Sequence, residues 1–374
     1  MGKVLLVGLG DVGTHMLEFL ARDPKCPELV VCDINEEVCS KRVNNALIGA
    51  AVAGLYPTMT FRKLDLSDVE GATRLIKEVD PEVVINSTVM QTWHVIRKLP
   101  DEVYAKVSSA SLGAWLPCQL GLSYKLMLAI KQSGLKPHVI NTSLSCMTNP
   151  ALAKVGLAPT IGIGNVELIA PAVRVLVHRR LNVPMDSVKA YLICHHVWWV
   201  YPREAGYKKG PFYLKAYVND KDVTGQLGDL TQFLYDSIKL YPPGIDFTTV
   251  SANSTIESMY ALMSPSGKFK HAPGPKGLSG GYPIEISNKG VDVVLPAGIT
   301  LEEAIKINED SNKIDGIDHF EEGGRVVYSD YTHKILKETI GFDCKSFMVQ
   351  DSYDVAKEMI KKYREFAAQY GVHY

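Results

Sequence analysis

The first part of the chain consists of short apolar runs that alternate with segments of helical periodicity. The runs lie at residues 3–7, 29–32, 60–66, 82–88, 137–143 and 159–165. Such alternation is typical of parallel strands joined by right-handed helical crossovers. The pattern therefore predicts an α/β fold with a doubly wound parallel sheet.

The hydrophobic pattern changes after Pro184. Residues 187–194 and 212–218 alternate like antiparallel strands, and helical patterns follow at 229–240, 249–263 and 352–369. We expect a surface loop over the Pro- and Gly-rich stretch 264–283, a hairpin over 282–295, a helix opened by a capping box at Thr300 and a strand at 325–328. This part predicts a second, mixed α+β domain, and we place the division so that the domains span residues 1–145 and 146–374.

A glycine-rich turn follows the first strand and leads at once into a helix. Gly8 permits a tight turn, Gly10 lets the backbone approach a pyrophosphate, and Gly13 lets the helix pack closely on the strand. The free backbone N–H groups of Asp11 and Val12 then meet phosphate at the positive end of the helix dipole. The turn predicts a dinucleotide-binding domain of Rossmann type.

Polar residues follow the carboxyl ends of the predicted strands, where ligands bind in open α/β sheets. Asp33 ends the second strand and is placed to accept hydrogen bonds from the adenosine ribose. Since it would also repel a 2′-phosphate, NAD is favoured over NADP. Asp65 is expected beside the adenine. The cleft residues are expected after the fourth and fifth strands, where the same side chains can alternatively cap the following helices: Asn86, Ser87, Thr88 and Asn141.

Composition narrows the class of partner. The formal net charge of −1 over 374 residues gives no electrostatic reason to expect nucleic acid or a membrane surface. The sequence has no apolar run long enough to span a bilayer and starts directly with a strand rather than a secretion signal. Its seven cysteines contain no CxxC pair, which argues against disulfides and a structural zinc site. We expect a cytoplasmic protein that binds a small-molecule substrate.

Two adjacent histidines end the strand at 187–194. Because side chains alternate along a regular strand, only one of His195 and His196 is expected to face the cleft. A histidine there can exchange the proton that accompanies hydride transfer to a carbonyl. The alternatives are metal binding together with Cys194 and a structural role beneath the two tryptophans that follow.

The connection over residues 89–136 is longer than one crossover needs and is expected to form a lid. Arg97 in this connection can hold a substrate carboxylate, or it is a solvated helix residue.

From Asn141 onward, the order of elements resembles the lactate/malate dehydrogenase superfamily. The resemblance rests on Asn141 at a strand end, the Gly162-Ile163-Gly164-Asn165 strand end, the helix 166–181 and the strand that leads to His196. It implies that His196 is the catalytic histidine and that Asn141 contacts substrate. In that family, an aspartate that orients the histidine and an arginine that binds the substrate follow the GxG strand end at fixed distances. The corresponding positions of this chain are Leu168 and Pro171. Glu167 and Arg174 are the nearest substitutes.

The resemblance implies an NAD-dependent oxidoreductase that transfers a hydride between nicotinamide and a hydroxyl-bearing carbon of a small anionic substrate. His196 would be the general acid/base, Asn141 would polarise the carbonyl, Glu167 would orient the histidine, and Arg174 or Arg97 would anchor the substrate. It also implies a homodimer or homotetramer.

Three alternatives remain. The amino-terminal half is also similar to the saccharopine dehydrogenase group, which implies an amino-acid or opine-type dehydrogenase. A redox-neutral NAD enzyme, like the NAD-dependent glycosidases related to this fold, would recruit a metal at Cys194 or His196. A protein that senses NAD without turnover is the third.

Overall fold

The computed structural model describes residues 2–200, 210–242 and 247–373. Its first part is a six-stranded parallel sheet in the order β3-β2-β1-β4-β5-β6, which confirms the predicted fold class. The strand order reverses between β1 and β4, so the connections that follow these two neighbouring strands run to opposite sides and leave a crevice at their carboxyl ends. The strands are β1 (Lys3–Val7), β2 (Glu28–Asp33), β3 (Met59–Lys63), β4 (Val83–Asn86), β5 (His138–Asn141) and β6 (Ile161–Gly162).

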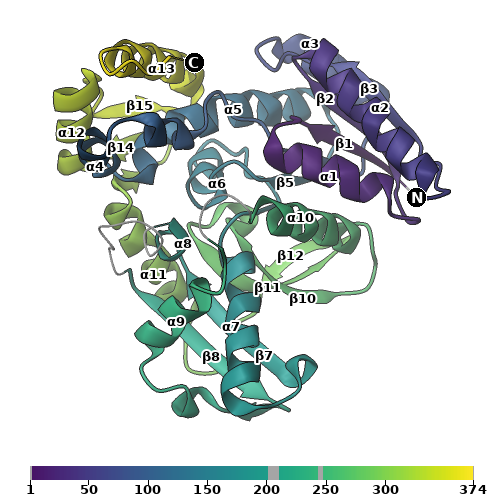
Figure 1. Cartoon of the computed structure of the whole chain (residues 1–374), viewed down its shortest axis with the longest axis vertical. Helices are drawn as coiled ribbons and strands as arrows, with labels where there is room; N and C mark the ends of the chain where they lie inside the picture. The colour runs from purple at the N-terminus through teal and green to yellow at the C-terminus, as the bar shows by residue number, and fades with distance from the viewer. Residues whose placement is uncertain (1, 201–209, 243–246, 374) are drawn as a thin grey trace.

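Helices cover both faces of this sheet (Figure 1). The segment expected as a lid is largely helical, because it contains two 3₁₀ turns and two α-helices before β5. These elements are α1 (Asp11–Ala21), α2 (Glu36–Val52), α3 (Val69–Val79), η1 (Trp93–Lys98), α4 (Asp101–Ser108), η2 (Leu112–Trp115), α5 (Leu116–Ser133) and α6 (Ser145–Ala153).

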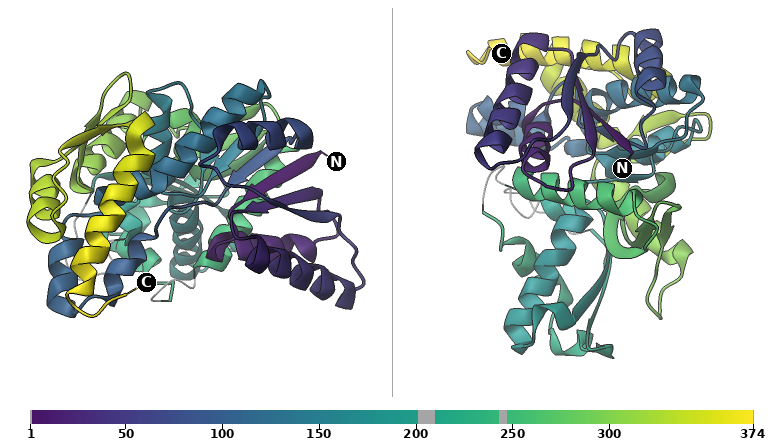
Figure 2. Two further views of the ribbon diagram at one scale, coloured as in Figure 1. Left: turned by 90° about the horizontal axis from the view of Figure 1, so that it is seen from above. Right: turned by 90° about the vertical axis from the view of Figure 1, so that its right-hand side faces the viewer.

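A second, antiparallel sheet has the order β10-β11-β7-β8-β9, with β12 paired to β11. In the right-hand view of Figure 2, this sheet and α7 lie below the parallel sheet. The bounds of α7 coincide with the predicted helix. The elements are α7 (Val166–Leu181), η3 (Met185–Ser187), β7 (Val188–Cys194), α8 (Val197–Val200), β8 (Phe212–Val218), β9 (Lys221–Asp222), η5 (Thr224–Gln226), α9 (Leu230–Ile238), α10 (Thr248–Leu262), β10 (Lys268–Pro273), η6 (Pro275–Gly277), β11 (Gly281–Ser287) and β12 (Gly290–Val293).

The surface loop expected over residues 264–283 is wrong, because this stretch contains β10 and the start of β11. His271 within β10 is buried and its Nε2 accepts the backbone N–H of Leu192 at 3.1 Å. The misleading signal was Pro273, which ends β10. Since β10 is the edge strand of its sheet, a proline there removes no ladder hydrogen bond that the sheet requires.

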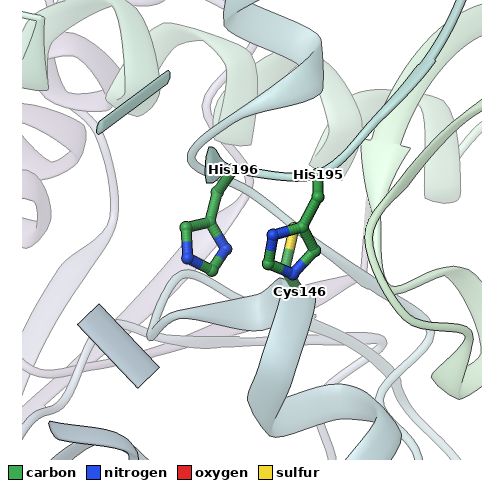
Figure 3. Close-up of side chains that lie close together, drawn as sticks. All are labelled: Cys146, His195 and His196. Atoms are coloured by element: carbon green, nitrogen blue, oxygen red, sulfur yellow. The ribbon is translucent and has the colours of Figure 1, made fainter. Parts of the chain in front are cut away.

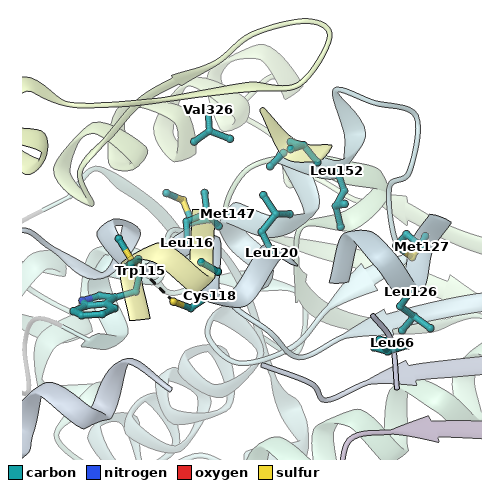
Figure 4. Packing of buried hydrophobic residues seen from close by; sticks show 14 of the residues in the cluster. Leu66, Trp115, Leu116, Cys118, Leu120, Leu126, Met127, Met147, Leu152 and Val326 are labelled. Atoms are coloured by element: carbon teal, nitrogen blue, oxygen red, sulfur yellow. Dashed lines mark hydrogen bonds between the residues drawn. The ribbon is translucent and has the colours of Figure 1, made fainter. Parts of the chain in front are cut away.

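The last part of the chain returns to the parallel-sheet domain. Helix α13 runs beside α5 (Figure 1), and the Trp115 and Tyr363 rings meet edge to face at 5.2 Å. Buried side chains from both segments form one cluster (Figure 4), and the Tyr328 hydroxyl donates to the Ala114 carbonyl at 3.0 Å. The elements are α11 (Leu301–Ile314), β13 (Ile317–Phe320), β14 (Arg325–Tyr328), α12 (Asp330–Ile340), β15 (Ser346–Met348), η7 (Val349–Asp351) and α13 (Ser352–Ala368).

These packing relations bear on the proposed domain division. Strand β6 lies beyond residue 145 yet completes the parallel sheet, and α13 packs on α5. The division into residues 1–145 and 146–374 stays a prediction. Among the helices of the described residues, none has the length and apolar character needed to cross a bilayer.

Candidate functional site

The glycine turn has the backbone geometry that the sequence predicts. Gly8 has φ +96°, and a Cβ there would meet the Ser87 carbonyl oxygen at 2.6 Å. A Cβ on Gly13 would meet the Gly8 carbonyl oxygen at 2.0 Å, so only glycine allows α1 to lie this close to β1. Gly10 differs, since a Cβ there would have nothing within 4 Å among the described residues. The turn is therefore tightly packed at Gly8 and Gly13 and has open space beside Gly10.

The amino terminus of α1 faces this open side. Its cap residue Gly10 supplies no side-chain hydrogen bond to the first turn, and both Asp11 and Val12 line the adjoining cavity. Helix N-terminal N–H groups without an internal partner bind anions, helped by the helix dipole. The turn therefore offers backbone donors to a phosphate.

The two predicted adenosine-side acids have different surroundings. Asp33, at the end of β2, accepts the Leu9 N–H at 2.8 Å through Oδ2 and the Asn35 N–H at 2.9 Å through Oδ1, so it is fixed against the glycine turn. The Arg42 guanidinium donates to the Leu9 carbonyl, which adds a cation that we did not predict. Asp65 lies after β3 on an exposed turn, where it accepts the Ser67 N–H at 2.8 Å.

A cavity of about 880 Å³ extends from the glycine turn to the second sheet. Side chains from the η1 segment form one wall, and side chains from α10 and the region after α9 form the opposite wall. The residues that the argument uses are Gly10, Ser87, Trp93, Arg97, Cys146 and His196.

The two strand-end asparagines hold the sheet together beneath the cavity. Asn86 Nδ2 donates to Asn141 Oδ1 at 3.0 Å, and Asn141 Nδ2 donates to Thr148 Oγ1 at 2.7 Å and Asn149 Oδ1 at 2.9 Å. Asn141 is 1% exposed. Because both of its amide donors and its oxygen are used within the protein, the geometry gives Asn141 a positioning role and does not support direct contact with a substrate carbonyl.

The two residues after Asn86 have different surroundings. Thr88 Oγ1 donates to Asn86 Oδ1 at 2.7 Å, a local bond between side chains. Neither residue caps a helix, because the next helical element, η1, begins at Trp93 and has Thr92 as its cap. Ser87 lines the cavity, as the cleft prediction requires.

His196 is held by an acid that the sequence did not point to. Its Nε2 lies 2.9 Å from Oδ2 of Asp315, a fully buried residue that follows α11. This hydrogen bond fixes the orientation of the ring. His196 Nδ1 is buried and has no hydrogen-bond partner among the described residues. The two residues form a histidine–carboxylate pair at the cavity.

The two residues proposed as substitutes in the family pattern lie elsewhere. Glu167 accepts the N–H groups of Gly164 and Asn165, so its carboxylate caps its own helix and does not orient His196. Burial raises the Glu167 pKa, and these backbone hydrogen bonds oppose the shift. Arg174 Nη2 donates to the Met185 carbonyl at 3.2 Å on the outer side of α7. Within residues 2–200, 210–242 and 247–373, Arg97 is the arginine that lines the cavity, with its guanidinium 5.1 Å from the Trp93 ring centroid.

His195 does not point away from His196. Strand β7 ends at Cys194, so strand alternation no longer applies, and the two imidazole ring centroids lie 4.1 Å apart (Figure 3). Cys146, from the start of α6, lies beside them (Figure 3). Burial lowers the His195 pKa and raises that of the Cys146 thiol. Cys194, which we considered as a metal ligand, is buried in the core beneath α7.

Comparisons with solved structures identify the architecture. Lactate dehydrogenase from Eimeria maxima, solved with NADH and oxamate, superposes with a TM-score of 0.57 at 14% identity over 84% of this chain and 93% of that chain. Malate dehydrogenase from Plasmodium falciparum has a TM-score of 0.56 at 14% identity, over 96% of this chain and 100% of that chain. The fold is that of lactate and malate dehydrogenases.

Two further comparisons concern the sequence. Residues 4–96 match the family model of the saccharopine dehydrogenase NADP binding domain, in agreement with the second resemblance. A search of curated proteins finds no match to the chain. Together, the fold and this domain match support a dehydrogenase with a nicotinamide dinucleotide site.

Asp315 and Cys146 are the residues that the sequence analysis missed. Asp315 follows a predicted helix but lies 119 positions from His196. Cys146 lies five positions after Asn141 in a stretch without metal-binding spacing. In a lone sequence, neither residue carries a local signal that links it to the histidines.

Proposed function

We propose that this protein is an NAD-dependent oxidoreductase that transfers a hydride between nicotinamide and a hydroxyl-bearing carbon of a small anionic substrate. The observation that carries the proposal is the His196–Asp315 pair, because it lies on the same cavity as the open glycine turn. A proton-exchanging group and a cofactor turn on one cavity are what an alcohol–carbonyl interconversion requires.

The cofactor residues fit a dinucleotide. Gly8, Gly10 and Gly13 shape the turn, Asp11 and Val12 offer backbone N–H groups at the uncapped start of α1, and Asp33 is fixed where a ribose diol would meet it. The bound nicotinamide would supply the hydride acceptor or donor. The Asp33 carboxylate favours NAD because it repels a 2′-phosphate.

His196 would hold and release the proton. With Asp315 on Nε2, the unpartnered Nδ1 takes the hydroxyl proton in oxidation and returns it in reduction. Buried Asp315 stabilises the imidazolium that forms. Asn141 and Asn86 act beneath the site by holding the ends of β4 and β5 together.

Arg97 would hold an anionic group of the substrate. Its place on the cavity wall against Trp93 supports this choice over Arg174, which faces the Met185 carbonyl. Arginine binds carboxylates through two parallel hydrogen bonds, which also orients the reacting carbon. Hydroxy acids and sugar acids are the substrate classes that we propose.

An amino-acid or opine-type dehydrogenase is the second candidate. The family-model match over residues 4–96 favours it, although this match covers only part of the parallel-sheet domain. The same cavity would then take an amino acid, and hydride transfer would occur at a carbon that bears nitrogen.

We further propose that the protein is a homodimer or homotetramer in the cytoplasm.

A substrate screen with NAD and NADP tests the proposal. Hydroxy acids, sugar acids and amino acids are each incubated with the protein, and absorbance at the nicotinamide band is followed. Turnover of a hydroxy or sugar acid with NAD supports the first proposal, and turnover of amino acids alone supports the second. NADH binding without turnover of any class would contradict both and indicate a sensing protein.

A further inference from the structure

Three side chains of types that bind metal ions come together from two separate segments (Figure 3), and two of them, Cys146 and His196, line the cavity. They are Cys146 at the start of α6 and the His195–His196 pair after β7. The thiol sulfur and one ring nitrogen of each histidine lie within 4.8 Å of one another, and all three residues are buried. We propose that this Cys146–His195–His196 cluster binds one divalent transition-metal ion of the Zn²⁺ class.

The first argument is the number of buried nitrogens without a hydrogen bond. Within the described residues, three ring nitrogens have no hydrogen-bond partner: both nitrogens of His195 and Nδ1 of His196. Buried polar atoms are nearly always hydrogen-bonded in native proteins, so three such atoms at one point require an explanation. A purely structural histidine pair leaves these atoms unexplained. A metal ion would use two of these three atoms, which are Nδ1 of His196 and one ring nitrogen of His195.

The second argument is the set of groups behind the cluster. Asp315 holds Nε2 of His196, which directs Nδ1 toward a ligand. The Cys146 sulfur receives N–H groups from the Asn165 side chain and the His196 backbone, and these hydrogen bonds oppose the upward shift of its pKa that burial causes. Metal-binding histidines and thiolates characteristically have such outer partners.

The third argument is the ligand chemistry and the open side. Tetrahedral zinc sites place sulfur and nitrogen ligands about 3.3–3.6 Å apart, so the cluster needs a contraction of only about 1 Å at its widest. One thiolate and two imidazoles suit Zn²⁺ or Co²⁺ and do not suit Mg²⁺ or Ca²⁺, which prefer oxygen ligands. Cys146 and His196 also line the cavity, so a fourth position would face the substrate. Three protein ligands with an open position are typical of catalytic metal sites.

The cluster bears on the proposed function, since it rests on the same cavity. With an ion bound, Nδ1 of His196 is a ligand and cannot also exchange the substrate proton. An ion there would polarise the substrate oxygen as a Lewis acid, and the hydroxyl proton released on oxidation would pass to water in the open cavity. Metal binding itself depends only on the three side chains, so it is measured without cofactor or substrate.

The test is a titration of the chelator-treated full-length protein with ZnCl₂, followed by calorimetry and by metal analysis after dialysis. We expect one ion per chain. Loss of a residue that hydrogen-bonds a metal ligand weakens metal binding by up to about 100-fold. Cys146→Ala and His195→Asn each remove a ligand itself, so each should weaken zinc binding by more than that. The matched control is Cys118→Ala, which removes an equally buried thiol that lies against Met359 in α13. The control should bind like the wild type.

Co²⁺ substitution provides a measurement that does not need a variant to fold. A thiolate-to-cobalt absorption band in the wild-type protein supports the cluster, and a spectrum of oxygen-bound cobalt overturns it. Substoichiometric zinc, or equal affinity in the wild type and Cys146→Ala, would also overturn it. Titration with NADH distinguishes the two proposals. NADH-dependent turnover without metal binding would contradict only the proposed metal site. Metal binding without cofactor binding would contradict only the proposed dehydrogenase function.

Discussion

His196 Nε2 lies 2.9 Å from Asp315 Oδ2, so the turn after β7 and the end of α11 meet in one buried histidine–carboxylate pair. In the proposed function, this carboxylate fixes the ring and stabilises its charged form. The same carboxylate fixes the ring if His196 binds a metal. Asp315 is therefore the residue whose removal should affect the site most without touching the substrate.

Asp315→Asn keeps the shape of the side chain and removes its charge. We expect turnover of a confirmed substrate to fall by about 10²- to 10⁴-fold, because the proton-exchanging histidine loses its orientation and its counter-charge. The measurement is the split between kcat and KM, in which kcat should fall while KM stays within a few-fold. Asp310→Asn is the control, since Asp310 lies in the helix that precedes Asp315 and pairs with Lys306. Equal kcat in the two variants would contradict the role proposed for the histidine–carboxylate pair.

Arg97 and Arg174 provide a matched pair for substrate binding. Arg97→Gln should raise KM for an anionic substrate by about 10- to 100-fold, because a charge-assisted hydrogen bond contributes about 1.5–3 kcal/mol. Arg174→Gln removes the same charge from a guanidinium that donates to the Met185 carbonyl, and KM should stay within a few-fold. Initial-rate kinetics on both variants decide the matter. The opposite order of effects would assign the anion site to Arg174.

Gly10 and Gly13 separate cofactor binding from folding. Gly10→Ala adds a methyl group with nothing within 4 Å among the described residues, so its melting temperature should stay near that of the wild type while NADH affinity falls at least about tenfold. Gly13→Ala places a Cβ 2.0 Å from the Gly8 carbonyl oxygen and should lower the unfolding free energy by about 1–3 kcal/mol. Thermal unfolding and NADH fluorescence titration give both quantities. Unchanged NADH affinity in Gly10→Ala would remove the turn from the cofactor site.

Asp33 sets the expected cofactor preference. Asp33→Ser should weaken NADH binding by about 10- to 100-fold through loss of charged hydrogen bonds to the ribose, and should narrow or reverse the preference over NADPH. Arg42 donates to the Leu9 carbonyl of the glycine turn. Its positive charge would attract the 2′-phosphate of NADPH once the Asp33 charge is removed. Glu36→Gln is the control for a nearby exposed charge. A wild-type preference for NADPH would contradict the role given to Asp33.

His271 makes folding stability depend on acid pH. Burial lowers its pKa to about 3, and its Nε2 must stay unprotonated to accept the Leu192 N–H. The unfolded chain takes up this proton near pH 6.5, whereas the folded chain does not until about pH 3, so the free energy of unfolding falls as pH drops below about 6.5. From pH 7 to 5 this residue should account for a loss of about 2 kcal/mol.

The His271→Gln variant keeps an acceptor for Leu192 and removes the titration. Urea unfolding at pH 7 and pH 5 should show a smaller loss in the variant than in the wild type by that amount. His195, whose pKa burial also lowers, is unchanged in both proteins and cancels in the comparison. An identical pH dependence in the two proteins would show that His271 is charged in the fold.

Local patterns were enough for much of the fold. The glycine turn, the bounds of α7 and the Thr300–Glu303 capping box depend on contacts between residues close in the chain, and the structure has each of them. The parallel strands themselves followed from the alternation of apolar runs and helices, whereas their order in the sheet was not predicted. The prediction of a surface loop over residues 264–283 was wrong. Whether a strand can contain Pro273 depends on the position of β10 at the edge of its sheet, which is a tertiary property.

The sequence by itself determined the glycine turn and the parallel sheet, because short-range sterics and periodicity encode them, whereas His196 was chosen over His195 only through the family resemblance. Only the tertiary structure decided what surrounds that histidine. It brings Asp315 to Nε2, gathers Cys146 and His195 beside Nδ1, and leaves Glu167 and Arg174 in local contacts. These relations join residues far apart in the chain, and they arise from the packing of α6, β7 and α11, which no local pattern specifies.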